Sequence, residues 1–316
     1  MINIIKQQYL DFDIKTTKSE NIFNKITTDP LIVSFRDLVP EIKDTSYLTH
    51  SIYYYPAKFI PHVVKYCIEN LSKENDLIID PFAGSGTVGL EALLMKRNAF
   101  LIDINLLLNH IIPIKAFRSS QFLKKGILID KLNQIYTNNS LFCPAWNNLD
   151  YWYPKEFLDI LKKYWGGQKI LEQDKYALII EASLIKVSKY FSYAEHKTPK
   201  LFKSKSKKKL VEELLNIDWQ KKLTEMIHST ALTYLERVNE MLMQTNEQDN
   251  TITYRGGVDS TKFIFNKDIQ LDLLITSPPY LQAQEYIRTS KMDLYWLGYN
   301  DEDIKKITRL EIPYRK

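Results

Sequence analysis

The chain has 316 residues, 45% of them hydrophobic, and a formal net charge of +5 at pH 7. This length and apolar content suffice for one large domain or for a domain with a sizeable insertion, and the mild basic excess permits a nucleic-acid partner without requiring one. The two cysteines, Cys67 and Cys143, show neither metal-like spacing nor a disulfide framework, so we expect no metal and a reducing, cytoplasmic location. No run approaches the roughly 20 apolar residues of a membrane span, so we expect no membrane partner.

The N-terminal part of the chain gives weak signals. Residues 1–45 are mixed in character and predict an N-terminal arm with short elements. Residues 47–58 predict a loop, and a helix with one apolar face follows at 61–71. The three adjacent tyrosines at 53–55 are more typical of partly buried loop aromatics than of ligand contacts, and a ligand clamp is the alternative.

The most informative stretch is 77–103. An apolar run at 77–79 is too short for a helix and is bounded by Asp80 and Pro81, so it predicts a buried strand. A glycine turn follows, then a helix over 88–95 and a second strand over 99–102 that ends in Asp103. Strand, glycine turn, helix and a strand with a terminal carboxylate predict a nucleotide-binding βαβ unit.

The residue types in this turn suit a ligand. Gly84 and Gly86 let the backbone bend tightly and approach a bound molecule, and the helix that follows directs free N–H groups at the turn. Asp103 lies about 20 residues past the turn, the place of an acid that binds ribose hydroxyls. Alternatives are a tight turn without ligand and, for Asp80, a strand-end cap. The spacing matches neither a dinucleotide fingerprint nor a phosphate-binding P-loop.

The region 119–250 does not follow a βαβ series. An amphipathic helix is predicted over 106–117, with a kink at Pro113. After it we expect a mainly helical insertion with helices at 122–136, 154–165, 174–190 and 207–244. Residues 196–209 hold seven lysines and no acid. A solvated loop is one interpretation. Phosphate contacts with DNA are the other, and we predict them for Lys197, Lys200, Lys203 and Lys205.

A second motif lies near the end of the sequence. A strand over 251–254 precedes a loop with Asp259, and an apolar strand over 271–275 runs into the sequence TSPPY at 276–280. The two prolines end the strand and stiffen the loop, which holds a serine, a carbonyl and an aromatic ring at the strand's carboxyl edge. An ordinary strand-end turn is the alternative. A helix over 284–298 follows, and for its Arg288 we weigh a DNA contact against a solvated helix face.

Together the two motifs resemble those of the amino-methylating DNA methyltransferases, which transfer a methyl group from S-adenosylmethionine to the exocyclic amine of cytosine or adenine. DPFAGSGT (80–87) is similar to the cofactor motif of this family, and TSPPY is similar to its catalytic motif. The Ser-Pro-Pro-Tyr form is typical of N4-cytosine enzymes, whereas N6-adenine enzymes usually carry Asp or Asn in the serine position. Residues 55–59 and 256–263 also resemble family segments.

The resemblance implies an α/β fold, a Rossmann-like doubly wound sheet with a large helical insertion, and S-adenosylmethionine as cofactor. Cofactor contacts are implied for Lys58, Phe59, Asp80, Pro81, Phe82, Gly84, Gly86, Thr87 and Asp103, with Asp259 near the adenine amine. Catalytic roles are implied for Ser277, Pro278, Pro279 and Tyr280. We predict that Ser277 Oγ and the Pro278 carbonyl accept the two amine hydrogens and that Tyr280 stacks on a flipped base. This requires the glycine turn and the TSPPY loop to meet at one rim of a parallel sheet.

The expected division of the chain is an N-terminal arm (1–45), a cofactor half (46–118), a helical, DNA-contacting insertion (119–250) and a catalytic half (251–316). The expected function is cytosine-N4 methylation of double-stranded DNA in a restriction-modification system with a cognate endonuclease. Alternatives are adenine N6, an RNA base, or a non-catalytic subunit. Enzymes of this family normally continue after the catalytic motif with strands that complete the sheet. We therefore expect an incomplete sheet and favour a split enzyme completed by a second subunit, or a truncated product. The alternative is that the arm 1–45 substitutes for the missing strands.

Overall fold

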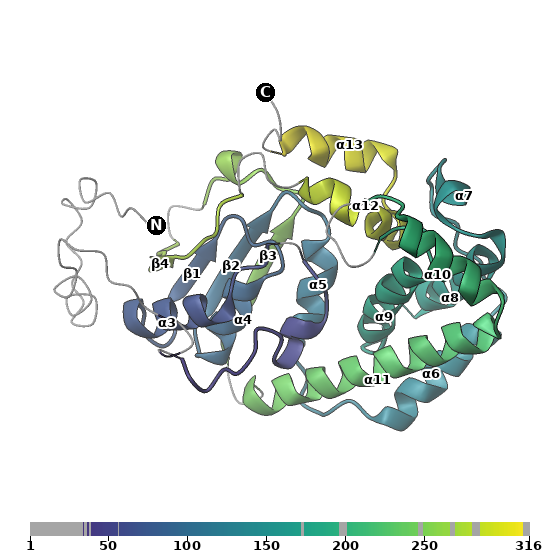
Figure 1. The fold of residues 1–316 in the computed structure, drawn as a ribbon. Helices are drawn as coiled ribbons and strands as arrows, with labels where there is room; N and C mark the ends of the chain where they lie inside the picture. The colour runs from purple at the N-terminus through teal and green to yellow at the C-terminus, as the bar shows by residue number, and fades with distance from the viewer. Residues whose placement is uncertain are drawn as a thin grey trace.

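The computed structural model describes residues 34, 37, 39–55, 57–171, 174–195, 201–245, 249–265, 269–279 and 285–311. Its sheet has four parallel strands in the order β3-β2-β1-β4. In Figure 1, α3 and α4 lie against the sheet, a group of helices from α6 to α11 lies beside it, and α12 and α13 lie above both. The elements, in chain order, are η1 (Leu48–Ser51), α3 (Pro61–Leu71), β1 (Leu77–Asp80), α4 (Thr87–Leu94), β2 (Asn98–Asp103), α5 (Leu108–Lys115), α6 (Lys125–Thr137), α7 (Leu149–Trp152), α8 (Lys155–Ile170), α9 (Ala177–Tyr190), α10 (Lys205–Leu215), α11 (Trp219–Thr245), β3 (Ile252–Gly256), η2 (Ser260–Lys262), β4 (Leu273–Leu274), α12 (Tyr286–Leu297) and α13 (Asp301–Leu310).

The register of the strands places small and branched side chains in one core layer. Ala99 of β2 pairs with Ile78 of β1 on one side and with Ile252 of β3 on the other. Val88 of α4 belongs to the same buried cluster as Ile78 and Leu101. Because paired residues of neighbouring strands share a face, this face of the sheet is the one that the helix after the glycine turn covers.

The opposite face is covered differently. Phe100 of β2 contacts Phe263 and Phe265, with ring centroids 5.4 and 5.2 Å apart, so the connection from β3 to β4 crosses this face. Leu274 of β4 points to the same face as Phe100 and is 60% exposed. In the part of the chain that the structure describes, no strand pairs with the outer edge of β4. The α/β fold with a parallel sheet and an open edge confirms the predicted Rossmann-like class and fits an incomplete sheet.

The helices between β2 and β3 agree in part with the sequence pattern. Helices α6, α8 and α9 form close to the predicted ranges, and α5 contains Pro113. The prediction of one helix over 207–244 is wrong, because the chain forms α10 and α11 with a break at 216–218. The Asn216 side chain donates to the Glu212 carbonyl at 2.9 Å, and the Asp218 carboxylate accepts the Lys221 N–H at 3.1 Å. Such local side-chain bonds to the backbone compete with a continuous helix.

An aromatic core joins α12 to this group of helices. Trp296 of α12 stacks on Trp165 of α8, with ring centroids 5.6 Å apart. The neighbouring Tyr295 stacks on Trp146 at 4.6 Å with an interplanar angle of 7°. The Trp296 indole N–H donates to Tyr153 Oη at 2.8 Å, so its buried polar group is satisfied. Helix α12 follows the TSPPY segment, but it packs with the helical group that precedes β3.

None of the helices that the structure describes is both long enough and apolar enough to cross a membrane.

Candidate active site

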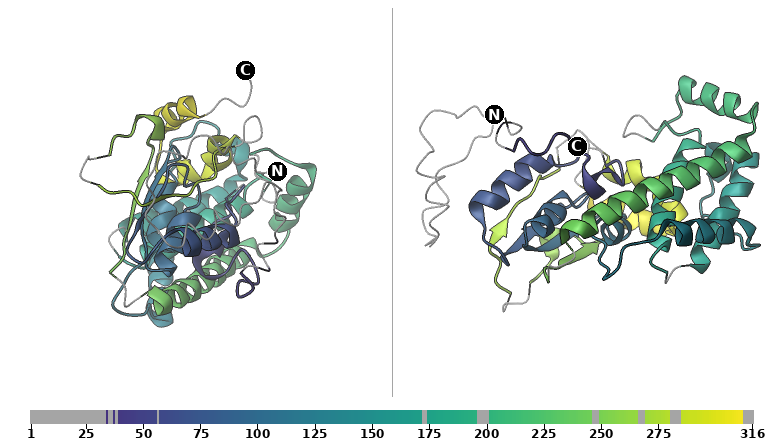
Figure 2. Two further views of the ribbon diagram at one scale, coloured as in Figure 1. Left: turned by 90° about the vertical axis from the view of Figure 1, so that its left-hand side faces the viewer. Right: turned by 90° about the horizontal axis from the view of Figure 1, so that it is seen from below.

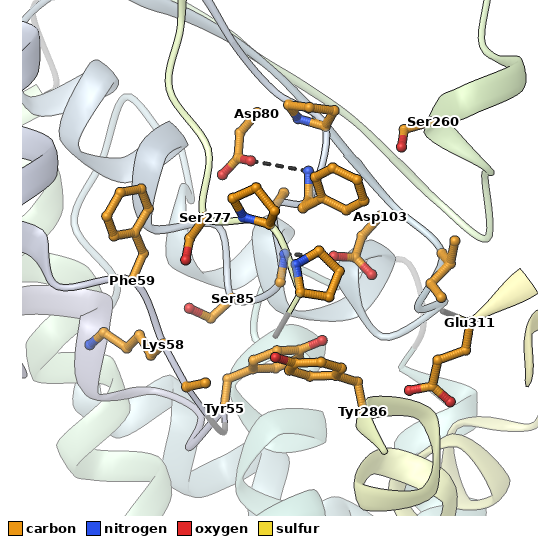
Figure 3. Close-up of a pocket in the computed structure, with 18 of the residues that line it drawn as sticks. Tyr55, Lys58, Phe59, Asp80, Ser85, Asp103, Ser260, Ser277, Tyr286 and Glu311 are labelled. Carbon is orange, nitrogen blue, oxygen red and sulfur yellow. Dashed lines mark hydrogen bonds between the residues drawn. The ribbon is translucent and has the colours of Figure 1, made fainter. Parts of the chain in front are cut away.

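A pocket lies at the carboxyl edge of the sheet. Four of its walls come from the segments that follow the four parallel strands: 80–85 after β1, 103–104 after β2, 259–261 after β3 and 277–279 after β4. The lining is completed by Tyr55, residues 57–59, Tyr286, Leu310 and Glu311. Carboxyl ends of parallel strands share one edge, which is where ligands bind in such sheets. Figure 3 shows the glycine turn and the Ser277 loop facing the same space, as the sequence prediction required.

The glycine turn has a backbone that other residues cannot adopt easily. Gly84 and Gly86 have φ angles of +50° and +75°. A Cβ on Gly84 would lie 3.1 Å from the Tyr55 ring, and one on Gly86 would lie 2.1 Å from Ile112 Cδ1. Gly84 lines the pocket, whereas Gly86 and Thr87 lie behind it at the start of α4. The structure thus brings eight of the ten predicted cofactor residues to the pocket, and these two support the turn from behind.

Asp103 is bound to the glycine turn. Its Oδ2 accepts the Gly84 N–H at 2.7 Å, and its Oδ1 accepts the Asn105 N–H at 2.7 Å. Burial raises the pKa of this carboxyl above its ordinary value, and the two N–H donors oppose that rise. The carboxylate therefore fixes the turn relative to the end of β2 while it lines the pocket.

Asp80 connects the two motifs directly. Its Oδ1 accepts the Phe82 N–H at 3.1 Å and the Thr276 hydroxyl at 2.7 Å. The residue is 2% exposed, and burial raises the pKa of its carboxyl to about 7, against the hydrogen bond from Thr276. One carboxyl group thus holds the end of β1 and the start of the Ser277 loop together.

Lys58 lines the pocket, but its ammonium points elsewhere. Nζ donates to the Thr45 carbonyl at 2.6 Å and to the His50 carbonyl at 3.3 Å. Burial lowers the pKa of Lys58 to about 8. In Figure 3 the amine lies on the far side of the side chain from the centre of the pocket, below Phe59. Its stem, rather than its charge, faces the site.

Asp259 lies on the wall that follows β3. Its carboxylate accepts hydrogen bonds from the Thr261 N–H at 3.0 Å and the Thr261 hydroxyl at 2.6 Å, and it pairs with Lys262 at 3.1 Å. These bonds, with the Thr261 side chain first, lower the pKa of Asp259. The carboxylate caps η2 and borders the pocket at the same time.

The predicted catalytic residues that the structure describes are all in the pocket. Ser277, Pro278 and Pro279 line it, and Ser277 lies on the same side as Phe59 in Figure 3. Tyr280 lies outside the described residues. The Thr276 bond to Asp80 fixes the beginning of this loop.

The predicted DNA-contacting residues are dispersed. Lys197 and Lys200 lie outside the described residues. Lys203 Nζ lies 3.5 Å from the centroid of the Tyr151 ring and 4.6 Å from that of Tyr193, which is a cation–π arrangement. Lys205 is exposed at the start of α10, and Arg288 is exposed but paired with Glu285 at 2.9 Å. Among the described residues of this set, Lys205 is therefore the one that is exposed, takes part in no ion pair and lies over no aromatic ring.

Several lining residues were not predicted from the sequence. Tyr55 belongs to the three loop tyrosines and to the 55–59 segment, but the sequence assigns it no contact of its own; its ring is stacked with that of Tyr286, with centroids 6.3 Å apart. Glu311 Oε1 accepts the Ile287 N–H at 3.2 Å, and burial raises the pKa of this carboxyl. Tyr286 is the first residue of α12, and Glu311 follows the last residue of α13. No local sequence motif marks either position. Ser85, Ser260 and Thr261 stand inside or beside predicted segments, so their proximity to the motifs was the available signal.

The described lining of the pocket holds more acidic than basic groups. Its carboxyl groups come from Asp80, Asp103, Asp259 and Glu311, and its cation comes from Lys58, whose ammonium points away. Burial raises the pKa of Asp80, Asp103 and Glu311, so these three carboxyls bind protons more readily than exposed ones. Among the described residues there is no group of three His, Cys, Asp or Glu side chains that could hold a metal ion.

A parallel α/β sheet with a glycine turn after β1, an acid at the end of β2 and a Ser-Pro-Pro loop after β4 has the Rossmann-like arrangement of the methyltransferases. A family profile described as DNA methylase matches residues 3–112. The chain is 26% identical over 302 residues to the type II methyltransferase M.MvaI of Kocuria varians, covering 85% of this chain and 62% of that protein. It is 24% identical over 304 residues to the type II methyltransferase M.BsoBI of Geobacillus stearothermophilus, covering 88% of this chain and 58% of that protein.

A third relative matches a shorter stretch of this chain. The type II methyltransferase M.MjaII of Methanocaldococcus jannaschii is 31% identical over 146 residues, which cover 45% of this chain and 27% of that protein. The chain therefore spans about three fifths of the length of the first two relatives. No solved structure matches it significantly. The chain is therefore similar to type II methyltransferases over most of its length, and its first 112 residues include a match to the DNA methylase profile.

Proposed function

We propose that this chain carries the catalytic pocket of a DNA methyltransferase that uses S-adenosylmethionine and acts on the exocyclic amine of a flipped base, with cytosine N4 as the target. The observation that carries the proposal is the common pocket of the glycine turn and the Ser277 loop, held together by the hydrogen bond from Thr276 to Asp80. A methyl donor bound at the glycine turn would lie next to an amine held at the Ser277 loop. The type II methyltransferases among the relatives support the same class of reaction.

The cofactor would lie along the glycine turn. When bound, S-adenosylmethionine supplies a methyl group on a positively charged sulfur, which is already electrophilic. Asp103 is placed to accept hydrogen bonds from ribose hydroxyls with the lone pairs that the Gly84 and Asn105 N–H groups leave free. Asp259 borders the same space on the β3 side and is assigned to the adenine amine. Phe59 and the stem of Lys58 would close the side nearest Ser277.

The target amine would be held by the Ser277 loop. The lone pair of an exocyclic amine is delocalised into its ring, so the nitrogen is a poor nucleophile until its hydrogens are directed out of the ring plane. Ser277 Oγ and the Pro278 carbonyl can accept these two hydrogens and draw the nitrogen toward tetrahedral geometry. Pro279 limits the motion of the loop. The protein's contribution is then mainly alignment of amine and methyl group, which is a large effect in bimolecular reactions.

Cytosine N4 is favoured over adenine N6 by the residue at the head of the loop. Ser277 is the form typical of N4-cytosine enzymes in the family that the chain resembles, and a serine hydroxyl is a weaker hydrogen-bond acceptor than a carboxylate or an amide oxygen. Adenine N6 and an RNA base are the competing targets. A non-catalytic subunit that keeps the cofactor fold is the competitor from a different class.

Double-stranded DNA is the proposed partner. The base must leave the duplex at a cost of a few kcal/mol, which contacts elsewhere must offset. Exposed Lys205 at the start of α10 and the basic segment before it would neutralise phosphates, and such contacts position the duplex without specifying its sequence. The proposed setting is a restriction-modification system in the cytoplasm, with a cognate endonuclease as a further partner.

The outer edge of β4 is the proposed site for additional strands. Leu274 on this edge is 60% exposed, and Leu271 and Ile269 just before it are also exposed. Exposed apolar edge strands favour pairing with another segment. The curated relatives are longer than this chain. A second subunit that supplies strands here would complete the sheet next to the Ser277 loop.

Transfer of a labelled methyl group tests the proposal. The chain is incubated with labelled S-adenosylmethionine and double-stranded DNA of mixed sequence, alone and with the product of any adjacent reading frame, and the DNA is digested to nucleosides. Labelled N4-methylcytosine is the expected product. Labelled N6-methyladenine as the sole product would remove the cytosine assignment. Cofactor binding without any transfer, in every combination, would favour the non-catalytic subunit.

A further inference from the structure

A fully buried lysine lies behind the glycine turn. Lys115, the last residue of α5, has 0% of its surface exposed. Its Nζ donates a hydrogen bond of 2.8 Å to the backbone carbonyl of Ser85, in the middle of the turn. Within the described residues, no carboxylate forms an ion pair with this ammonium. Lys115 does not itself line the pocket, whereas Ser85 does.

Burial of this lysine works against folding. Burial, together with the nearby charge of Lys58, lowers the pKa of Lys115 to about 7. A buried ammonium without a carboxylate partner is costly, and an apolar side chain of similar shape in its place is often neutral or stabilising. Folding stability therefore does not explain a lysine here. A buried amine that does not favour folding and that contacts a turn of the pocket points to a role in binding.

The surrounding contacts show what the amine does. On one side of the turn, the Gly84 N–H is held by Asp103 at 2.7 Å; on the other side, the Ser85 carbonyl is held by Lys115 at 2.8 Å. Thr49 Oγ1 donates to the backbone carbonyl of Lys115 at 2.7 Å and anchors the end of α5 to the segment that leads to Tyr55. The turn is thus fixed at both faces by one acid and one amine.

We propose that Lys115 is a positioning residue for the cofactor: it keeps the glycine turn in its binding conformation by holding the Ser85 carbonyl from behind. The inference rests on the proposed function, because it takes the turn to be the cofactor site. Without the amine, the turn would populate other conformations, and the apparent affinity would fall by the fraction that remains competent.

The test uses Lys115→Met, which keeps the length and shape of the side chain and removes the donor. Cofactor binding to the full chain is measured by calorimetry with S-adenosylmethionine and, separately, with S-adenosylhomocysteine. Loss of the buried hydrogen bond to the Ser85 carbonyl predicts that Kd rises about tenfold. Lys115→Gln, which retains a neutral N–H donor, is expected to lie between wild type and Lys115→Met. Thermal unfolding without cofactor is expected at the wild-type temperature or above it for Lys115→Met.

Lys207→Met is the matched control. Lys207 of α10 is also buried (1% exposed), and its Nζ donates to a backbone carbonyl, that of Tyr190, within the helical group. It is not among the residues that line the pocket. Its replacement should leave both cofactor affinities unchanged, whatever its effect on unfolding temperature.

The outcomes distinguish failure of the proposed function from failure of the proposed role of Lys115. A wild-type chain that binds neither ligand overturns the proposed function and this inference with it. A wild-type chain that binds, together with Lys115→Met of unchanged affinity, overturns this inference alone. Lys115→Met that unfolds at a lower temperature than wild type and loses affinity, with Lys115→Gln equally impaired, would make Lys115 a structural residue and overturns the positioning role. Weaker binding at undiminished stability supports it.

Discussion

Replacement of Asp80 by asparagine should change how stability depends on pH. The Asp80 carboxyl is 2% exposed, and its pKa is raised by burial from 3.8 to about 7. A group whose pKa is higher in the folded than in the unfolded chain contributes stability that is present at low pH and lost as the pH rises through the folded-state value. At 1.36 kcal/mol per pKa unit, ionisation of Asp80 removes at most about 4 kcal/mol between pH 4 and pH 8.

Asp80→Asn lacks this loss but keeps an oxygen that can accept from Thr276 and Phe82, the two donors to Asp80 Oδ1. Urea unfolding of both proteins is measured from pH 4 to pH 8. The variant should match wild type within about 1 kcal/mol at pH 4 and exceed it by roughly 2–4 kcal/mol at pH 8, because other titrating groups cancel in the difference. Parallel pH profiles, with a constant difference between the two proteins, would refute the argument that burial controls this carboxyl.

Three further predictions concern the turn, the loop and the basic face. Gly86→Ala should destabilise the chain by about 3 kcal/mol in urea unfolding, since its φ is +75° and its Cβ would meet Ile112; Gly126→Ala in α6, where a Cβ meets nothing within 4 Å, should not destabilise it. Ser277→Ala should lower the single-turnover rate of methyl transfer about 100-fold, with the Kd for the cofactor unchanged; an unchanged rate would remove Ser277 from the chemistry. Lys205→Ala should weaken DNA binding and reduce the slope of log K against log salt concentration by about 1. The control Lys221→Ala removes a lysine that pairs with Glu225 and should change neither quantity. Equal effects of the two substitutions would contradict a phosphate contact at Lys205.

The sequence was most informative where a function depends on neighbours in the chain. Strand, glycine turn and helix at 77–94 follow from a local pattern, and so does the rigid loop at 276–279. Their meeting in one pocket follows from the general rule that parallel strands share a carboxyl edge. These features could be predicted because each is set by residue types within a few positions.

Features that depend on tertiary packing were not accessible in the same way. Tyr286 and Glu311 reach the pocket because α12 and α13 fold back over the sheet edge (Figures 1 and 2), and neither residue stands in a motif. The lysine stretch at 196–209 predicted a basic loop, yet Lys207 is buried and Lys203 lies over aromatic rings. A lysine has the same letter whether its amine contacts water, a ring or a carbonyl, and only the fold distinguishes these environments.

The stacked indoles of Trp165 and Trp296 connect α12 to the helical group. The described segments on the two sides of the Ser277 loop therefore belong to different parts of the fold: β4 belongs to the sheet, and α12 packs on the helical group. A shift of that group relative to the sheet would change the separation of these two segments, so the packing of the two indoles bears on the position of Ser277.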